Sequence, residues 1–332
     1  MHVAAEAADT MVAWQGYPAA AGDSAIARSF AEQGFLLLPE PLWGPGLLEA
    51  AVEGMNMVIA GDNDTGSAVG SPGRVGSFEP GALIKLENPQ YSSRGIRSLL
   101  GGARWLGERV ARMTGAGWVQ IWHVQLLAKP SLLAAAAAAD SSVGWHQDRH
   151  YHSGDWADGS EILTAWIALS DVNSDSGPMR FVDGSHRWGL LSADGNDFFG
   201  QDLPSQRSSL EHAAPAGAEW TETPVLLPRG GCSVHDDFTI HGSEANTSGG
   251  TRRSLVCHMR TNRSVLRSQT VADRSTERSI ADSGRYSASP PVPAAEGHEH
   301  EELEVCPVIF GAEAFEAQRR RERRECTTKA KM

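Results

Sequence analysis

The chain has 332 residues, of which 41% are hydrophobic, and its formal net charge at pH 7 is −12. The length and the hydrophobic fraction predict a globular protein with a substantial core. The acidic balance argues against nucleic acid as a partner, because a nucleic-acid footprint needs a basic face, although a local group of Arg and Lys side chains can still bind an anion.

We expect neither a membrane span nor a secretion signal. No apolar stretch reaches the ~20 residues that a transmembrane helix needs, and Met1 to Gln15 lacks the basic start and apolar run of a signal peptide. The four cysteines have neither metal-site spacing nor the density of a disulfide framework; they are Cys232, Cys257, Cys306 and Cys326. Reduced thiols in a cytoplasmic protein with no membrane partner are therefore expected.

The first third of the chain shows helical spacing. End signals and periodicity predict helices from Asp23 to Gly34, from Pro45 to about Ile59 and from Arg94 to Met113. Phe35 to Pro39 predicts a short buried strand between the first two helices. Gly61 to Gly81 is rich in Gly, Ser and Asp without periodicity, which predicts a loop suited to act as a lid.

From Gly117 onward the pattern becomes strand-like. Strand candidates are residues 118–127, 144–147, 163–169, 179–182, 223–227, 232–235, 239–242 and 254–260. Because turn signals separate them and no helices are expected between them, they favour a mainly β fold with flanking helices, a double-stranded β-helix (jelly roll, cupin-like). We interpret residues 190–220 as a polar, irregular insertion between strands.

The C-terminal part is strongly polar. Ser264 to His300 is rich in Ser, Arg and Pro, which predicts an excursion from the core, and Phe310 to Arg324 predicts a terminal helix. We therefore divide the chain into an N-terminal arm (residues 1–22), a central jelly-roll domain with its N-terminal helices (23–262), and a polar C-terminal excursion with a terminal helix (263–332).

The most informative motif is Trp145-His146-Gln147-Asp148. Residues two apart in a strand point the same way, so His146 and Asp148 can converge on one metal ion, and the distant His241 can supply a second imidazole. Such a 2-His-1-carboxylate set leaves coordination positions open and is typical of non-haem Fe(II) oxygenases.

A His-x-acid motif is weak by itself, and the chain has two others, beginning at His235 and at His300. The second lies in the polar C-terminal segment and is interpreted as a solvated acidic loop. His235 stands six residues before His241, so strand parity can place both on one face. We interpret His235 as a substrate contact or a hydrogen-bonded histidine in preference to an alternative ligand.

A second group of residues supports a cosubstrate site. Arg252 follows His241 by eleven residues and is followed by Ser254. An Arg and a hydroxyl on one strand suit a carboxylate held near the metal. A 2-oxo acid that chelates iron through its 1-carboxylate and keto oxygen needs such an anchor for its far carboxylate.

Taken together, four blocks resemble the phytanoyl-CoA dioxygenase (PhyH-like) family of Fe(II)/2-oxoglutarate-dependent oxygenases. The resemblance covers roughly Phe30 to Arg260 with the order of the blocks preserved. The blocks are Trp145-His146-Gln147-Asp148, Trp166 within residues 163–169, Gly177-Pro178-Met179-Arg180-Phe181-Val182-Asp183-Gly184-Ser185-His186, and His241-Gly242-Ser243 with Arg252.

The resemblance implies that His146, Asp148 and His241 bind Fe(II) and that Arg252 holds the C5 carboxylate of 2-oxoglutarate, with O2 as the second cosubstrate. It also places Ser243, Trp166 and Lys129 at cosubstrate contacts, and His123 and Gln147 at the active-site lining. Trp166 could equally be a core residue, and Lys129 a surface strand end. His150 and Trp156 belong to a loop that either lines the substrate mouth or is an exposed turn.

The expected activity is hydroxylation of an unactivated C–H bond of a small-molecule metabolite, with release of succinate and CO2. Desaturation and cyclisation would use the same site. The family accepts acyl-CoA thioesters, amino-acid derivatives and secondary metabolites, and the acidic balance favours a small free metabolite here. Alternatives are a non-oxidative metal-dependent jelly-roll enzyme, which leaves Arg252 and Ser254 without a purpose, and a silent 2-oxoglutarate or metabolite-binding protein. The sequence does not indicate an oligomeric state.

Overall fold

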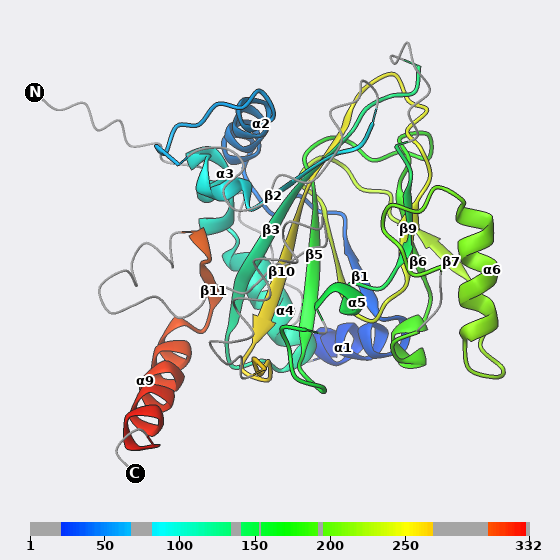
Figure 1. Ribbon diagram of the computed structural model, residues 1–332. Helices are drawn as coiled ribbons and strands as arrows, with labels where there is room; N and C mark the ends of the chain where they lie inside the picture. Colours follow the sequence, from blue (N-terminus) through cyan, green and yellow to red (C-terminus); the bar gives the residue numbers. More distant parts are fainter. Residues whose placement is uncertain are drawn as a thin grey trace, which may run out of the picture.

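The computed structural model describes residues 21–67, 82–133, 141–152, 154–191, 195–267 and 305–329. Two antiparallel sheets face each other, and helices cover the outer side of the larger one (Figure 1). This arrangement confirms the predicted mainly β, jelly-roll-like fold with flanking helices. Of the helices in the described part of the chain, none is long and apolar enough to span a membrane.

The larger sheet, called the major sheet below, has seven strands. Its strand order is β1 (Phe35–Leu38), β8 (Cys232–Asp236), β5 (Ile162–Ala168), β10 (Arg252–Thr261), β3 (Val119–Lys129) and β11 (Val308–Phe310), and β2 (Ile84–Glu87) also pairs with β3. The smaller one, the minor sheet, has the order β4 (Val143–His146), β9 (His241–Ser243), β6 (Met179–Val182) and β7 (Glu222–Pro224).

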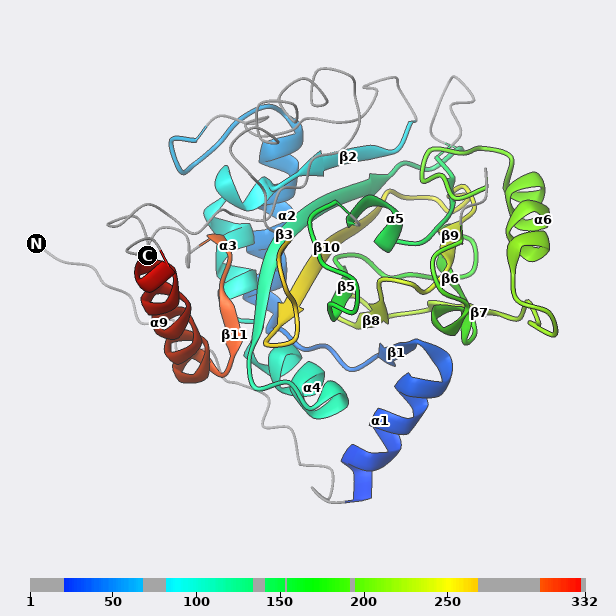
Figure 2. The ribbon, with the colours of Figure 1, turned by 60° about the horizontal axis from the view of Figure 1, so that its bottom comes forward.

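Helices from the N-terminal part cover the outer face of the major sheet. They are α1 (Ala21–Gln33), α2 (Pro45–Ile59), α3 (Arg94–Gly101) and α4 (Arg104–Thr114), with the short 3-10 turn η1 (Pro89–Tyr91) before α3. Figure 2 shows α2, α3 and α4 on the side of β3 and β10 that faces away from the minor sheet. Apolar side chains of these helices and of the outer sheet face form the main core, which includes Met55, Leu99 and Leu255.

A β-bulge decides which side chains of β3 face the interior between the sheets. In the pairing with β10, Ile121 lies opposite Met259 and His123 opposite His258, so Trp122 is an extra residue. Val119 and Ile121 before the bulge pack in the outer core, as do residues 124 and 126 after it. The bulge therefore turns His123, Gln125 and Leu127 towards the minor sheet.

The remaining elements surround the minor sheet and the C-terminus. They are α5 (Arg149–His152), the 3-10 helix η2 (Ser185–Trp188), α6 (Leu203–Ala213) and α9 (Ala312–Lys329). Figure 1 shows α6 beside β7 at the edge of the minor sheet, and α9 after β11 at the opposite end of the molecule.

The structure corrects several predicted elements. The helix expected at 94–113 is two helices, because Gly101 and Gly102 interrupt it. The insertion expected to be irregular at 190–220 contains α6, whose start is capped by Asp202, which accepts from the backbone N–H of Ser205, with Pro204 in its first turn.

The sequence analysis also missed β2 and β11. β11 adds an edge strand to the major sheet from within the segment interpreted as an excursion. Other expectations fall outside the described residues: the N-terminal arm up to residue 20, residues 68–81 of the lid-like loop, and residues 268–304 with the His300 motif. The division at residues 22 and 262 stays a proposal.

Candidate active site

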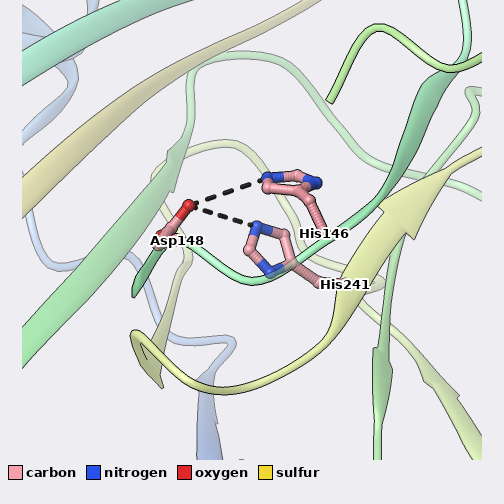
Figure 3. Close-up of side chains that lie close together, drawn as sticks. All are labelled: His146, Asp148 and His241. Atoms are coloured by element: carbon pink, nitrogen blue, oxygen red, sulfur yellow. Dashed lines mark ion pairs between the residues drawn. The ribbon is translucent and has the colours of Figure 1, made fainter. Parts of the chain in front are cut away.

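The structure brings His146, Asp148 and His241 together in the interior. All three are buried, and their potential ligand atoms lie within 4.8 Å of one another. Oδ1 of Asp148 is 3.6 Å from Nε2 of His146 and 3.8 Å from Nε2 of His241 (Figure 3). Two ligands about 2.1 Å from one ion at right angles are roughly 3 Å apart, so small movements would let these atoms share a metal.

Both imidazoles are held in the same way. Nδ1 of His146 lies 2.8 Å from the carbonyl oxygen of Gly144, and Nδ1 of His241 lies 3.0 Å from that of Thr239. A carbonyl accepts only, so Nδ1 carries the proton in each ring and Nε2 keeps its lone pair. Each Nε2 is thus available as a metal ligand, which is the usual arrangement at histidine metal sites.

The backbone of β4 aims His146 at this point. Between the pairs Val143–Ser243 and His146–His241, β4 has one residue more than β9. This irregularity turns His146 to the face that carries His241, as bulges near active sites commonly do. Gly144 permits it, because a Cβ there would lie 2.0 Å from the backbone oxygen of Asp197.

The sequence analysis expects Asp148 on the same strand as His146, but the structure does not place it there. β4 ends at His146, and Asp148 lies where the chain turns into α5, with its carbonyl accepting from the backbone N–H of Tyr151 at 2.9 Å. The convergence of the two side chains therefore comes from this turn and not from strand parity.

The charges of the three groups suit a divalent cation. Burial lowers the pKa of His146 to about 4, and burial followed by the neighbouring histidines lowers that of His241 well below its ordinary value. Burial opposes ionisation of Asp148, but His241 and the hydrogen bond from His235 outweigh it, so its pKa lies well below the usual range. Neutral imidazoles and an ionised carboxylate are the states that bind metals.

Arg252 lies in the same cavity and lacks an anionic partner. It is buried, and Nη1 donates to the carbonyl of Gly177, while Nε has no hydrogen-bond partner in the part of the chain that the structure describes. Among the described residues no carboxylate comes within ion-pair distance of it. Burial lowers its pKa to about 10, so it remains charged at neutral pH. An unpaired buried guanidinium is costly, and a bound carboxylate would relieve that cost.

The cavity lies between the two sheets. The three candidate ligands and Arg252 line it, together with Lys85, Gln125, Ser243, Trp166, His235 and Phe198. Of the predicted cosubstrate contacts, Ser243 and Trp166 thus face the cavity, and the Trp166 ring lies 5.2 Å from the Arg252 guanidinium. Lys85 is buried beside Glu87, with 3.3 Å between Nζ and Oε1.

Two other predicted cosubstrate contacts lie behind the cavity wall. Nζ of Lys129 donates to Oγ of Ser243 at 2.7 Å and to the carbonyl of Glu244 at 2.6 Å. It is buried, so it is not a surface strand end. The hydroxyl of Ser254 is buried without a hydrogen-bond partner in the described structure. Neither residue is among those that line the cavity, so the structure does not favour direct contact between either of them and a cosubstrate.

Three residues expected at the substrate side are placed elsewhere. The Gln147 amide donates to the carbonyls of Gly189 and Phe238 and accepts from the backbone N–H of Leu191, so it ties loops together. Trp156 packs on Trp122 in a small core of its own. Neither Gln147 nor Trp156 is among the described residues that line the cavity. His150 is exposed and does not line the cavity, which agrees with the exposed-turn interpretation.

His123 and His235 have different surroundings. Nε2 of His123 is 2.8 Å from Oε2 of Glu87, behind the cavity lining. His235 lines the cavity, and its Nε2 is 3.3 Å from Oδ2 of Asp148. His235 is therefore a hydrogen-bonded histidine next to the candidate ligands, one of the two interpretations favoured from the sequence.

Lys85, Thr164 and His258 are among the site residues that the sequence analysis missed. Lys85 lies on β2, which was not predicted. Thr164 and His258 both line the cavity and lie next to Asp148. The signal for His258 was present, because it shares strand parity with Arg252 and Ser254, and Thr164 shares it with Trp166.

Comparison with known proteins places this site in a family. The family model for phytanoyl-CoA dioxygenase (PhyH) matches residues 99–254, which include all three candidate ligands and Arg252 in the expected order. His241, Asp148 and His146 meet at one point in that same stretch.

The chain carries a PhyH-family domain.

This match confirms the resemblance seen in the sequence. The ectoine dioxygenase of Halomonas elongata is 28% identical over 257 residues, covering 71% of this chain and 70% of that protein.

Two solved structures of the α-ketoglutarate-dependent epimerase SnoN from nogalamycin biosynthesis share the fold of this chain. The first has a TM-score of 0.58 at 17% identity and covers 87% of this chain and 99% of the other. The second, a complex with Fe3+, α-ketoglutarate and nogalamycin RO, has a TM-score of 0.56 at 19% identity and covers 76% and 89%.

Proposed function

We propose that this protein is an Fe(II)- and 2-oxoglutarate-dependent dioxygenase that hydroxylates an unactivated C–H bond of a small-molecule metabolite, with release of succinate and CO2. One observation carries the proposal: three convergent metal-type ligands and a buried, unpaired Arg252 line the same cavity. A metal site alone would not need a buried guanidinium without a counter-ion.

His146, Asp148 and His241 would hold Fe(II), which supplies the activation of O2 when bound. The residues of the chain bind and orient the organic partners. 2-Oxoglutarate is a dianion, and its far carboxylate would find a positive charge at Arg252, which is buried and lines the cavity. Ser243 and Trp166 would complete the surroundings of the carboxylate at Arg252.

The shape of the cavity supports a compact substrate. The same cavity, lined by residues of both sheets, has to hold both 2-oxoglutarate and the substrate. Leu127, Val143 and Met179 contribute apolar surface to the lining, which keeps water from the reacting bond. Ectoine, named in the description of the Halomonas relative, is a small zwitterion and the first compound to test. The free, buried thiols of Cys232, Cys257 and Cys306 support a cytoplasmic location.

A non-oxidative metal-dependent enzyme and a silent 2-oxoglutarate-binding protein are the competing functions. An assay of succinate formation from 2-oxoglutarate under air, with purified protein, Fe(II) and ascorbate, distinguishes the proposed function from both. We expect succinate above the level of an Asp148→Ala control, and a larger amount when a substrate such as ectoine is present. A wild-type protein that binds 2-oxoglutarate but yields no more succinate than the control, with or without candidate substrates, would contradict the proposed function.

A further inference from the structure

The two oxygens of the Asp148 carboxylate have different surroundings. Oδ1 faces the Nε2 atoms of His146 and His241. Oδ2 points the other way, towards the major sheet, and accepts a hydrogen bond from Oγ1 of Thr164 at 2.7 Å. His235 adds a second contact, with 3.3 Å between its Nε2 and Oδ2. One oxygen is thus occupied by the protein while the other faces the imidazoles.

The donors on Oδ2 come from one row of the major sheet. The register places His123 opposite His258, His258 opposite Thr164, and Thr164 opposite His235, on the neighbouring strands β3, β10, β5 and β8. Residues opposite each other in antiparallel strands point to the same face. All four are polar and buried on the side that faces Asp148. Burial of such a polar row costs free energy unless its members are hydrogen-bonded.

The hydrogen-bond count fixes the direction of each bond in the row. A threonine hydroxyl has one proton, and Thr164 uses it on the carboxylate, which in its ionised form can only accept. The contact of 3.0 Å between Thr164 Oγ1 and His258 Nδ1 must therefore run from the histidine N–H to the hydroxyl oxygen. His258 thereby orients the Thr164 hydroxyl towards Asp148. Its ring is held by stacking on His123, with 5.2 Å between centroids and 10° between planes.

We infer that Thr164, oriented by His258, is a positioning residue that holds Oδ2 of Asp148, so that the carboxylate presents Oδ1 alone to the metal. His235 supports the same oxygen from the neighbouring strand. One-oxygen binding by Asp148 occupies one coordination position and leaves the rest of the open face for the cosubstrates. The inference rests on the proposed function, because it requires the metal to be bound by this triad.

The test compares the metal affinities of protein variants that keep or lose the hydroxyl at position 164. Mn2+ serves as the probe, and the electron paramagnetic resonance signal of free Mn2+ gives the dissociation constant without turnover. Thr164→Val removes the hydroxyl at nearly constant volume, and we expect affinity to fall about 10- to 100-fold, as for other partners of metal ligands. Thr164→Ser keeps the hydroxyl, so we expect its Mn2+ dissociation constant to stay within about 3-fold of the wild-type value, well under a tenfold change.

Thr261 offers a matched control. It is also buried in the major sheet, and its hydroxyl donates to a carboxylate oxygen, Oε2 of Glu161, at the same distance of 2.7 Å. Thr261→Val should lose stability but bind Mn2+ like the wild-type protein. If Thr164→Val does not fold, Thr164→Ala replaces it in the comparison with Thr164→Ser.

A second readout uses Co2+, whose visible absorption reports coordination number. The spectrum should change in Thr164→Val, where Oδ2 keeps only its longer contact with His235 and can turn towards the metal, and not in Thr261→Val. The inference is overturned if Thr164→Val binds Mn2+ like the wild-type protein, or if Thr164→Ser is as weak as Thr164→Val. His241→Ala, measured in parallel, tests the metal site itself: if its Mn2+ affinity matches the wild type, the proposed function has failed, and not only the role of Thr164.

Discussion

The two sheets that face each other across the cavity contribute to the site in different ways. In the major sheet, Arg252, Thr164 and Trp166 project from long strands; β3 alone has 11 residues, all buried. In the minor sheet, β4 has 4 residues and β9 has 3, and the candidate ligands lie at strand ends or, for Asp148, beyond one. Strand pairing thus fixes the cosubstrate side, whereas the ligand side needs additional support.

That support comes from side chains that hydrogen-bond to the backbone around the ligands. Gln206 on α6 accepts from the backbone N–H of Trp145, one residue before His146. Ser185 accepts from the backbone N–H of Ile240, one residue before His241. Gln147 binds the carbonyl of Phe238 from the other side. The ligand geometry therefore depends on a polar network, and substitutions in the two sheets should have different consequences.

The largest effect is expected on the ligand side. His146→Ala or Asp148→Ala removes one of three candidate ligands, and succinate formation from 2-oxoglutarate should fall to the background of an enzyme-free reaction. Asp171→Ala, a change to an exposed carboxylate outside the site, serves as the control and should retain wild-type turnover. Near-normal turnover in either ligand variant would refute the ligand assignment.

A change on the cosubstrate side should act on binding. Arg252→Ala leaves the far carboxylate of 2-oxoglutarate without its buried partner, which should weaken binding by roughly 2–5 kcal/mol, measured by calorimetry with Mn2+ in place of iron. Mn2+ affinity should be unaffected, because Arg252 is not a candidate ligand. Arg253→Ala is the matched control, since this neighbour is only half-buried and its guanidinium bonds the carbonyl of Thr251. Equal affinities in the two variants would show that another residue holds the carboxylate.

The same contrast explains what the sequence could predict. Arg252 was identified from its place eleven residues after His241 and from the neighbouring Ser254, and Trp166 through the family resemblance; both lie on long strands of the major sheet. His146, Asp148 and His241 were found through their motif and not through geometry. The strand assumed to carry both His146 and Asp148 ends at His146, and a backbone irregularity in β4 supplies the convergence. Such local irregularities in strand pairing cannot be predicted from the periodicity of hydrophobic residues in a sequence.

The missed residues have physical reasons of their own. Ile84-Lys85-Leu86-Glu87 alternates like a half-exposed strand, yet both of its charged side chains are buried against one another and against His123. Burial of an ion pair depends on partners far away in the sequence, so composition alone could not indicate it. The family resemblance places Gln147 at the active-site lining, but the turn after β4 directs its amide into the loops.

The support network gives a smaller effect on stability. Gln147→Met removes an amide that satisfies the carbonyls of Gly189 and Phe238 and the N–H of Leu191. Each buried partner left unsatisfied costs about 1–3 kcal/mol, so the free energy of unfolding should fall measurably in urea titrations. Because the network positions the ligands, Mn2+ affinity should fall as well. Gln201→Met, at an exposed position, should change neither. A destabilised Gln147→Met protein with unchanged metal affinity would mean that the ligand side does not depend on this network.

The smallest effect is expected just beyond the ligands, at His150. It lies in α5, two residues after Asp148, but its side chain is exposed and does not line the cavity. His150→Ala should therefore change the free energy of unfolding by less than about 0.5 kcal/mol and leave the KM for 2-oxoglutarate unchanged. His152, two residues further, is buried and lines the cavity. Comparing the two variants tests whether position in the cavity, and not nearness in the sequence, decides the effect. His152→Ala should impair turnover, whereas His150→Ala should not. An equal loss of turnover in both variants would place the cavity mouth at the exposed face of α5.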